Sequence, residues 1–494
     1  MKKTMKKLSC FLLSLLMMLS VASPAFAKTN VTPVILVHGL GANPVYQNIG
    51  TPDQSEIENL GMGNIVVGLL TNNEVLNEVV KMLDDEREPD VDKLIAGLQN
   101  IIGKDNAINC TKNGNIKAGQ GVINYWTDPL SKHKDYWQNA DVAEVAIARQ
   151  LCNTVGAKNV YAFNYDWRQD VCTTAKQLNK FIKTVKKNTK AKKVSLIGCS
   201  LGGAVLSAYF DAYKKQKDVK VAVFANPAIG GVDVASAYAL DLKINKKSVI
   251  AYLKCMETAF NGGSSQGLFR AVRALGDKRV EQAADYLAKF VKNKKNVKKL
   301  YMKVVKPWIG NIPSLWECIP YSSYDKAVKE MSKMGFLDKK SGVYTKIKKY
   351  HGVQGRLKKN LKAIKKQGVQ VAIFASYGTM GIPLTSKVNN QTDALIDTKY
   401  ASAGATVADY GKKLKKSGKY VSGDKVINAK TCVLPDNTWF LKDVQHMRFY
   451  YNSDATKLVA NIACGKVKAN IKAVKKKYKK GQFLKEVNRK LKNV

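Results

Sequence analysis

Short, continuous apolar runs alternate along most of the chain with longer segments of helical periodicity. Each run is long enough for a strand that is buried on both faces, as in parallel sheets covered by helices on both sides. We therefore predict an α/β fold with a mostly parallel central sheet. The predicted strands cover residues 32–37, 159–164, 193–197, 219–224, 369–375 and 438–441.

Two long segments interrupt this alternation. Residues 59–137 combine Gly-rich apolar and acidic parts and are interpreted as an insertion or lid, whereas the lysine-rich residues 243–352 have a largely helical pattern and are predicted to form a cap. Both are expected over the carboxyl ends of the strands, where such sheets bind ligands. The main domain is predicted to span residues 28–465.

The final segment, residues 466–494, places apolar residues at helical spacing with lysines between them. This pattern predicts a basic amphipathic C-terminal helix. Two interpretations stay open for it: a helix docked on the domain, or a helix lying on a membrane surface.

The first 27 residues resemble a secretory signal peptide. Lysines precede an apolar stretch at residues 8–21, and Ala25-Phe26-Ala27 supplies the small residues of a cleavage site. No later run approaches the ~20 apolar residues that a membrane-spanning helix needs. The sequence therefore predicts a secreted protein, and its basic charge suggests association with the cell envelope.

The chain has 82 Lys and Arg residues against 38 Asp and Glu, a formal net charge of +44. The lysines are dispersed, and no single module combines Arg with aromatic residues, which disfavours a nucleic-acid-binding protein. The charge indicates either a solvated surface or attraction to an anionic membrane or envelope.

Cysteine and histidine usage gives no sign of a metal site. Eight of the nine cysteines follow the predicted signal peptide, and an even number in an exported protein permits disulfides such as Cys432–Cys464. No Cys-x-x-Cys pair occurs and only four histidines are present, so neither zinc nor another cofactor is expected.

Residues 193–209 have the pattern of a nucleophile elbow. An apolar strand leads into Gly198-Cys199-Ser200-Leu201-Gly202, and a helix-compatible segment follows. In this motif the serine lies on a sharp strand-to-helix turn that exposes its hydroxyl, and glycines are needed because the turn leaves no room for a Cβ. We interpret Ser200 as the nucleophile.

A serine hydroxyl needs an imidazole base, which in turn needs a carboxylate, and in this fold they follow in the order Ser, acid, His. Only two histidines follow Ser200. His351 precedes the strand 369–375, after which the acid is expected, so it comes too early. His446 follows the last predicted strand and is therefore predicted to be the base.

The acid is less constrained by the pattern. Asp424 follows Gly423 at a loop tip that leads into an apolar segment, and we predict that it is the triad carboxylate. The competing aspartates are interpreted as exposed turn or helix-end residues: Asp393, Asp397, Asp409, Asp436 and Asp443.

An oxyanion hole needs two backbone N–H groups directed at the developing negative charge. We predict one from Leu201, which follows the nucleophile, and one from Leu40, in the glycine-containing loop after the first strand. His38 lies in the same loop, but its place in the chain order argues against a role as the base.

These elements resemble the lecithin:cholesterol acyltransferase-like lipases and acyltransferases of the α/β-hydrolase fold. The resemblance implies that fold with inserted caps, and it implies the same triad of Ser200, Asp424 and His446. The chain departs from the family at Cys199, Lys425 and the His38-Gly39 pair. The matching segments, in family order, are Pro33 to Gly41, Tyr165 to Arg168, Gly198 to Gly202, Pro313 to Glu317, Gly423 to Val426 and Gln445 to Met447.

The sequence thus predicts a secreted serine hydrolase that cleaves carboxylic esters of lipids through an acyl-enzyme on Ser200. A lipid O-acyltransferase with the same triad is one alternative, and a non-catalytic polycationic surface-binding protein is another. The expected partners are a lipid ester and an anionic membrane or envelope, without a specific nucleic acid.

Overall fold

The computed structural model describes residues 31–57, 72–83, 88–102, 107–138, 143–259, 270, 272–415, 417–474, 481–488 and 490–494. The predicted signal peptide, residues 1–27, lies outside these ranges. Among the helices that are described, none combines the length and the apolar character needed to cross a membrane.

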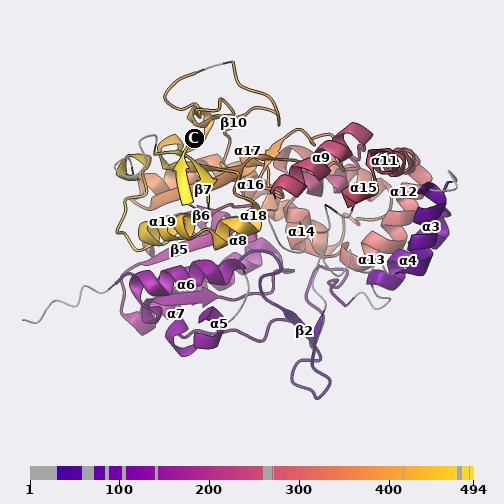
Figure 1. The fold of residues 1–494 in the computed structure, drawn as a ribbon. Helices are drawn as coiled ribbons and strands as arrows, with labels where there is room; N and C mark the ends of the chain where they lie inside the picture. The colour runs from indigo at the N-terminus through magenta and orange to yellow at the C-terminus, as the bar shows by residue number, and fades with distance from the viewer. Residues whose placement is uncertain are drawn as a thin grey trace, which may run out of the picture.

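An eight-stranded sheet forms the centre of the molecule (Figure 1). Neighbouring strands are parallel throughout, except that the last strand at one edge is antiparallel. All six predicted strands are present, and the α/β-hydrolase prediction is confirmed. The strands, in spatial order, are β14 (Lys490–Asn493), β13 (Phe483–Val487), β12 (Thr438–Lys442), β7 (Gln370–Tyr377), β6 (Val219–Ala225), β5 (Val194–Cys199), β1 (Val34–Val37) and β4 (Val160–Phe163).

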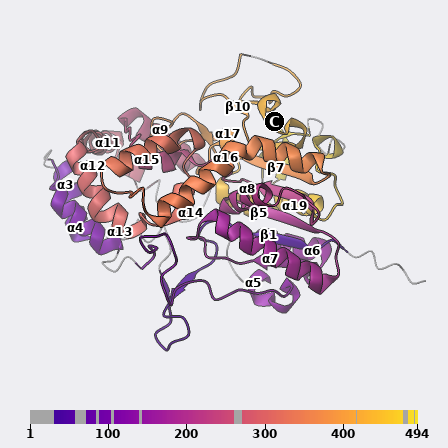
Figure 2. The same ribbon diagram turned by 180° about the vertical axis from the view of Figure 1, so that it is seen from behind.

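Helices cover both faces of the sheet. One face carries α7 (Val171–Thr189), α8 (Leu201–Ala212) and α16 (Gly342–Lys366), seen in Figure 2. The other carries α6 (Ala143–Val155), α18 (His446–Tyr451) and α19 (Ser453–Ala463), seen in Figure 1.

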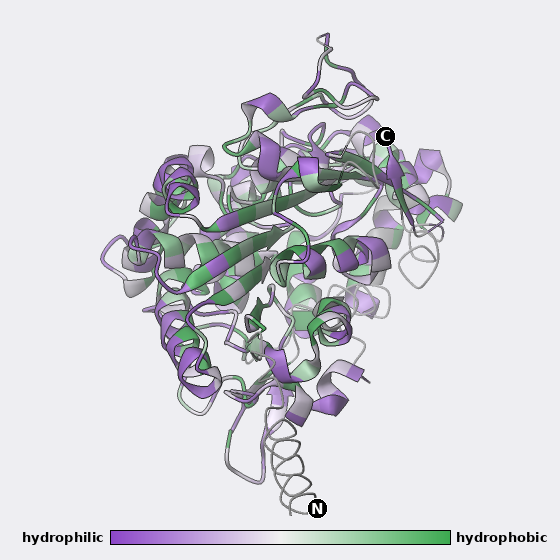
Figure 3. Cartoon of the chain, turned by 90° about the vertical axis from the view of Figure 1, so that its left-hand side faces the viewer, coloured by the Kyte–Doolittle hydropathy of each residue, from purple (hydrophilic) through white to green (hydrophobic). Residues whose placement is uncertain are grey.

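The core lies in two layers, one on each side of the sheet. Ile35 and Val37 of β1 belong to one apolar cluster, while Val34 and Leu36 belong to the other, because successive side chains of a strand point to opposite faces. The strands therefore appear as an apolar band between helices with hydrophilic outer sides (Figure 3). This two-sided burial explains why the strands are continuous apolar runs in the sequence.

Most helices of the segments interpreted as insertions form a helical lobe beside the sheet (Figure 1). Within residues 59–137 the structure describes α3 and α4, which pack against the lobe, and α5 (Lys134–Gln138), which packs against α6 instead. The helices of the lobe are α3 (Asn73–Leu83), α4 (Val91–Ile102), α9 (Lys246–Ala259), α11 (Asp277–Lys292), α12 (Lys294–Leu300), a π-helical turn (Tyr301–Val305), α13 (Lys306–Ile309), α14 (Pro313–Glu317) and α15 (Tyr324–Lys333).

Small two-stranded ribbons shape the loops at the carboxyl edge of the sheet. Between β7 and β12 the chain forms two such pairs of short strands. The helical turn α17 (Thr398–Ala401) lies between the two pairs in the sequence. The short pairs are β2 (Val45–Gln47) with β3 (Ser55–Ile57), β8 (Thr379–Met380) with β9 (Gln391–Thr392), and β10 (Thr406–Val407) with β11 (Ile427–Asn428).

The prediction of a C-terminal helix is wrong. Within residues 466–494 the structure describes a 3-10 turn at Ile471–Val474, then β13 and β14; residues 475–480 lie outside the described ranges. β13 pairs with β12, which would otherwise be an unpaired edge, and its Phe483 and Leu484 are buried. Ile471 and Val474, two of the apolar positions that suggested a helix, are buried in the 3-10 turn, so burial and sheet pairing outweighed the helical spacing.

Candidate active site

Ser200 lies at the strained turn between β5 and α8. Its backbone has φ 52° and ψ −118°, outside the regions that residues with a side chain favour. A Cβ on Gly202 would lie 2.2 Å from the carbonyl oxygen of Val37, and a Cβ on Gly198 would lie 2.7 Å from that of Gly202. Both glycines are therefore required by close backbone approach, as the sequence pattern predicted.

The structure brings His446 to Ser200 across 246 positions of the sequence. His446 is the first residue of α18, and its Nε2 lies 3.1 Å from the Ser200 Oγ. Its Nδ1 lies 2.7 Å from Oδ2 of Asp393. With Nδ1–H donated to the carboxylate, Nε2 is free to accept the serine proton, which is the geometry of a Ser–His–Asp triad.

Asp393 is held rigidly in the turn after β9. Its Oδ1 accepts hydrogen bonds from the amides of Leu395, at 3.0 Å, and Ile396, at 2.6 Å. Its backbone carbonyl accepts from the amide of His446 at 2.6 Å. The side chain is 1% exposed. One carboxylate oxygen thus fixes the loop while the other faces the imidazole.

The prediction that Asp424 faces His446 is wrong. Asp424 instead accepts hydrogen bonds from Tyr377 and Ser422, and it forms an ion pair with Lys442 at 2.9 Å. Burial disfavours its charge, but the hydrogen bonds from Ser422 and Lys442 outweigh that effect and lower the pKa of this carboxyl. Its hydrogen-bonding capacity is used in its own loop, which it ties to β7 and β12.

The loop after β1 brings Leu40 to the same site as Leu201. Both residues line one cavity with Ser200 and His446. Leu201 is the first residue of α8, so its amide has no intrahelical acceptor. This arrangement is consistent with the predicted pair of oxyanion donors.

His38 supports this loop and is not a base. Its Nδ1 lies 2.7 Å from the carbonyl oxygen of Gly39, and its Nε2 lies 2.8 Å from the side-chain amide nitrogen, Nδ2, of Asn43. Its ring stacks on Tyr165 at 4.2 Å. Burial lowers the pKa of His38 to about 4, so the ring is neutral at pH 7. Because the Gly39 carbonyl is held by His38, the N–H of the same peptide, that of Leu40, points the opposite way.

A cavity of about 510 Å³ opens at Ser200 and is lined almost entirely by apolar side chains. Val232, Ala235 and Tyr238 come from the segment after β6, and Trp308 and Leu315 come from the helical lobe. Leu395, 41% exposed, and Met447, 52% exposed, lie at its opening. The cavity suits a hydrocarbon chain next to the nucleophile.

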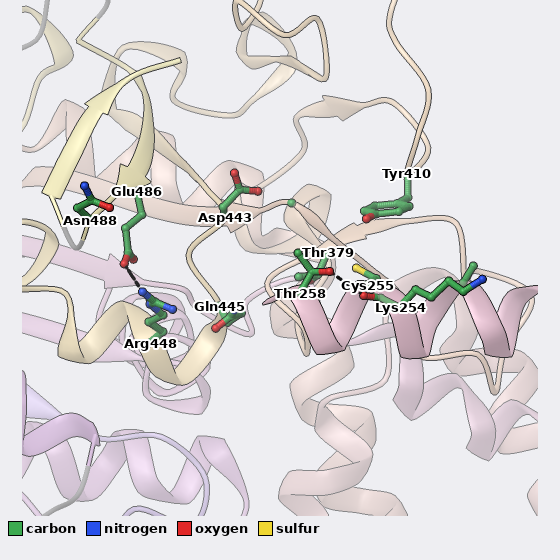
Figure 4. Close-up of a pocket in the computed structure, with 12 residues that line it drawn as sticks. Lys254, Cys255, Thr258, Thr379, Tyr410, Asp443, Gln445, Arg448, Glu486 and Asn488 are labelled. Atoms are coloured by element: carbon green, nitrogen blue, oxygen red, sulfur yellow. Dashed lines mark hydrogen bonds and ion pairs between the residues drawn. The ribbon is translucent and has the colours of Figure 1, made fainter. Parts of the chain in front are cut away.

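A second cavity, of about 730 Å³, lies beside the same α18 segment, and most of the residues that line it have polar or charged side chains. Figure 4 shows Arg448, paired with Glu486, on one side and Lys254 and Cys255 of α9 on the other. Gln445, which directly precedes His446, also lines it. His446 is thus flanked in the sequence by Gln445, which lines the second cavity, and by Met447, which lines the apolar one.

Other residues that the sequence marked out are structural. His351 stacks against Tyr324 at 3.9 Å, away from Ser200. Arg168 and Asp166 form a fully buried ion pair at 2.7 Å. In the part of the chain that the structure describes, Cys432 and Cys464 are free thiols, and no cluster of potential metal ligands occurs.

The model of the lecithin:cholesterol acyltransferase family matches residues 92–240. The resemblance to this family is confirmed. The match covers the elbow and the Tyr165–Arg168 segment, whereas Asp393 and His446 lie beyond it, so their assignment depends on the geometry above. This similarity to a group of lipases and acyltransferases indicates an enzyme that acts on esters.

Two further comparisons add little. Among solved structures, one entitled "The crystal structure of Tle4-Tli4 complex" is similar at 11% identity and a TM-score of 0.33, over 88% of this chain and 98% of that one. A likeness this distant carries no argument. No curated protein sequence matches the chain.

Proposed function

We propose that this protein is a secreted serine hydrolase that cleaves carboxylic esters of lipids. The observation that carries the proposal is the hydrogen-bonded series Ser200, His446 and Asp393 at the opening of an apolar cavity. A nucleophile, its base and the residue that orients the base thus converge where an acyl chain would be bound.

In this mechanism, the Oγ of Ser200 attacks the ester carbonyl carbon while His446 Nε2 takes its proton. The amides of Leu40 and Leu201 donate hydrogen bonds to the resulting oxyanion. Asp393 stabilises the imidazolium, which then protonates the leaving alcohol as the C–O bond breaks. Water, deprotonated by His446, attacks the acyl-Ser200 and releases the carboxylic acid and free enzyme.

The apolar cavity supports a lipid substrate. Removing an acyl chain from water gains roughly 0.8 kcal/mol per buried methylene, so longer esters should bind more tightly until the cavity is full. The predicted export and the positive charge support a place of action outside the cell, in contact with an anionic membrane or envelope.

The test is hydrolysis of p-nitrophenyl butyrate and palmitate by the purified protein and by Ser200→Ala. We expect kcat to fall at least about 10⁴-fold in the variant, since removing a triad nucleophile has effects of this size. Ser207→Ala is the matched control, because Ser207 is a buried serine of α8, the helix that follows Ser200, and its hydroxyl donates to the Ala204 carbonyl. Turnover that survives Ser200→Ala contradicts the mechanism.

Acyl transfer to another alcohol is the second candidate. The second cavity, beside Gln445, favours it, because an acceptor hydroxyl held there would lie near His446. Adding glycerol or a sterol to the assay would then produce a new ester at the expense of the free acid. Free acid alone in every case would leave water as the acceptor.

A further inference from the structure

The lysines of α7 and α16 form one surface. Both helices pack against α8 and against each other on the same side of the sheet (Figure 2). Residues Leu201 to Phe210 of α8 are buried, so the outer surface here is made by α7 and α16. We call this surface, made of the exposed sides of α7 and α16, the lysine face.

Neither helix contains a carboxylate. On α7, exposed lysines follow one another at intervals of four, three and four residues, which places them on one side of the helix. On α16, four of the seven exposed lysines follow one another at intervals of eleven, three and four residues, which also places them on one side of the helix. These two rows are Lys176, Lys180, Lys183 and Lys187 on α7, and Lys348, Lys359, Lys362 and Lys366 on α16.

The carboxylates that border the lysine face are already neutralised. Asp211 is paired with Arg356 at 2.7 Å, and Asp218 is paired with Lys186. Among the residues that the structure describes, none of the eight lysines in the two rows has a carboxylate within 4.0 Å. Their charges are therefore free to act on an external partner.

Other surfaces of the protein differ from the lysine face because they carry acidic residues beside their basic ones. On the opposite side of the sheet, α6 and α19 each contain one acidic and one basic residue. In the helical lobe, Lys246 and Lys254 lie near acidic residues of α11, and Arg273 lies near Glu257 and Asp277. The lysine face differs from these surfaces because neither of its two helices contributes an acidic residue.

We infer that the lysine face binds the surface of an anionic lipid bilayer. At 1.5 Å per residue the helices extend about 28 Å and about 37 Å, so two rows of charge cover a broad area. The face has one arginine, Arg356, which is already paired. Lysines act as point charges, suited to many mobile lipid phosphates, whereas nucleic-acid recognition favours the bidentate guanidinium.

This attachment leaves the apolar cavity accessible. Met447, at the cavity opening, belongs to α18, which packs on the opposite side of the sheet from α7 and α16 (Figures 1 and 2). Binding through the lysine face would hold the protein at a membrane without covering the opening. The inference does not depend on the proposed hydrolysis.

The experiment is co-sedimentation of the purified protein with vesicles of ether-linked lipids, which an esterase cannot hydrolyse. Vesicles with 30% phosphatidylglycerol ether are compared with purely zwitterionic ones, in low and in high salt. The test variant carries Lys180→Gln, Lys183→Gln, Lys359→Gln and Lys362→Gln. The control carries Lys278→Gln, Lys292→Gln, Lys294→Gln and Lys295→Gln, four exposed lysines of the lobe.

We expect binding to anionic vesicles only, lost in high salt. The partition coefficient should fall at least about 50-fold in the lysine-face variant and less than about 5-fold in the control, which has the same net charge. Equal losses in the two variants would show a general charge effect and overturn the inference. So would absence of binding at low salt, or binding to soluble polyphosphate without binding to vesicles.

Discussion

Two loops between β7 and β12 each present an aspartate, and they differ in what surrounds it. Asp393 lies in a tight turn after β9, with one oxygen bound by backbone amides and the other facing His446. Asp424 lies further along the chain, where a lysine and two hydroxyl groups surround the carboxylate. Both are well-placed loop carboxylates in the sequence, but only Asp393 has an oxygen directed at the imidazole.

The comparison shows what a triad acid requires. A carboxylate that orients a histidine must be held by groups that leave one oxygen free for the imidazole. Backbone amides do this for Asp393 because they come from its own turn. The Lys442 ammonium competes for Asp424 and lowers its basicity, so this residue is better suited to stabilising the loop than to stabilising an imidazolium.

Among changes to these two loops, Asp393→Asn has the largest expected effect. The amide can still accept hydrogen bonds from Leu395 and Ile396, but it presents an NH₂ group to His446 and favours the wrong tautomer. We expect kcat for p-nitrophenyl esters to fall about 10³–10⁴-fold. Asp409→Asn, an exposed aspartate between the same two strands, is the control. An Asp393→Asn enzyme with near-normal kcat would remove Asp393 from the triad.

Asp424→Asn should affect stability and leave chemistry almost unchanged. Losing the charge weakens the contacts with Lys442 and Ser422, at a cost of about 1–2 kcal/mol in the free energy of unfolding. We expect kcat to change by less than about 3-fold. Urea denaturation of Asp424→Asn, Lys442→Gln and the double variant would measure the coupling of the pair. A loss of kcat as large as that of Asp393→Asn would return the catalytic role to Asp424.

Asp397, which anchors the Asp393 loop, is expected to affect only the pH dependence of stability. Asp397 accepts hydrogen bonds from Asn390, at 2.6 Å, and from the amide of Asp233, at 2.8 Å. Burial raises its pKa to about 6, with the nearby Asp233 carboxylate adding to the rise. The folded protein therefore binds a proton here below about pH 6, while the unfolded chain does so only near its ordinary pKa of 3.8.

Lowering the pH from 7 to 4.5 should thus stabilise the folded state through this group by about 2 kcal/mol. Asp397→Asn lacks the titrating group and should lose that contribution. The measurement is urea denaturation of both proteins at the two pH values, which cancels the effects of all other groups. The same pH dependence in parent and variant would show that Asp397 does not carry the shift.

Much of the site could be predicted because its signals are local or ordered along the chain. The elbow around Ser200 needs glycines at two positions for steric reasons, and His446 follows the last long apolar strand. Asp393 also left a signal: it is the first aspartate after the apolar strand 369–375, and Leu395 and Ile396 follow it. The loop tip at Gly423-Asp424 and the apolar segment after it favoured Asp424 instead, and the family resemblance pointed to the same residue.

The sequence by itself determined the parallel sheet and the tight turn at Ser200, because buried strands and strained turns restrict residue types over a few neighbouring positions. The order of the elements along the chain also marked out His446. Only the tertiary structure decided the acid, the C-terminal strands and the lysine face. Each depends on residues distant in sequence: which carboxylate meets an imidazole, which sheet edge needs a partner, and which helices share a surface. Such contacts arise from packing, and no local pattern specifies them.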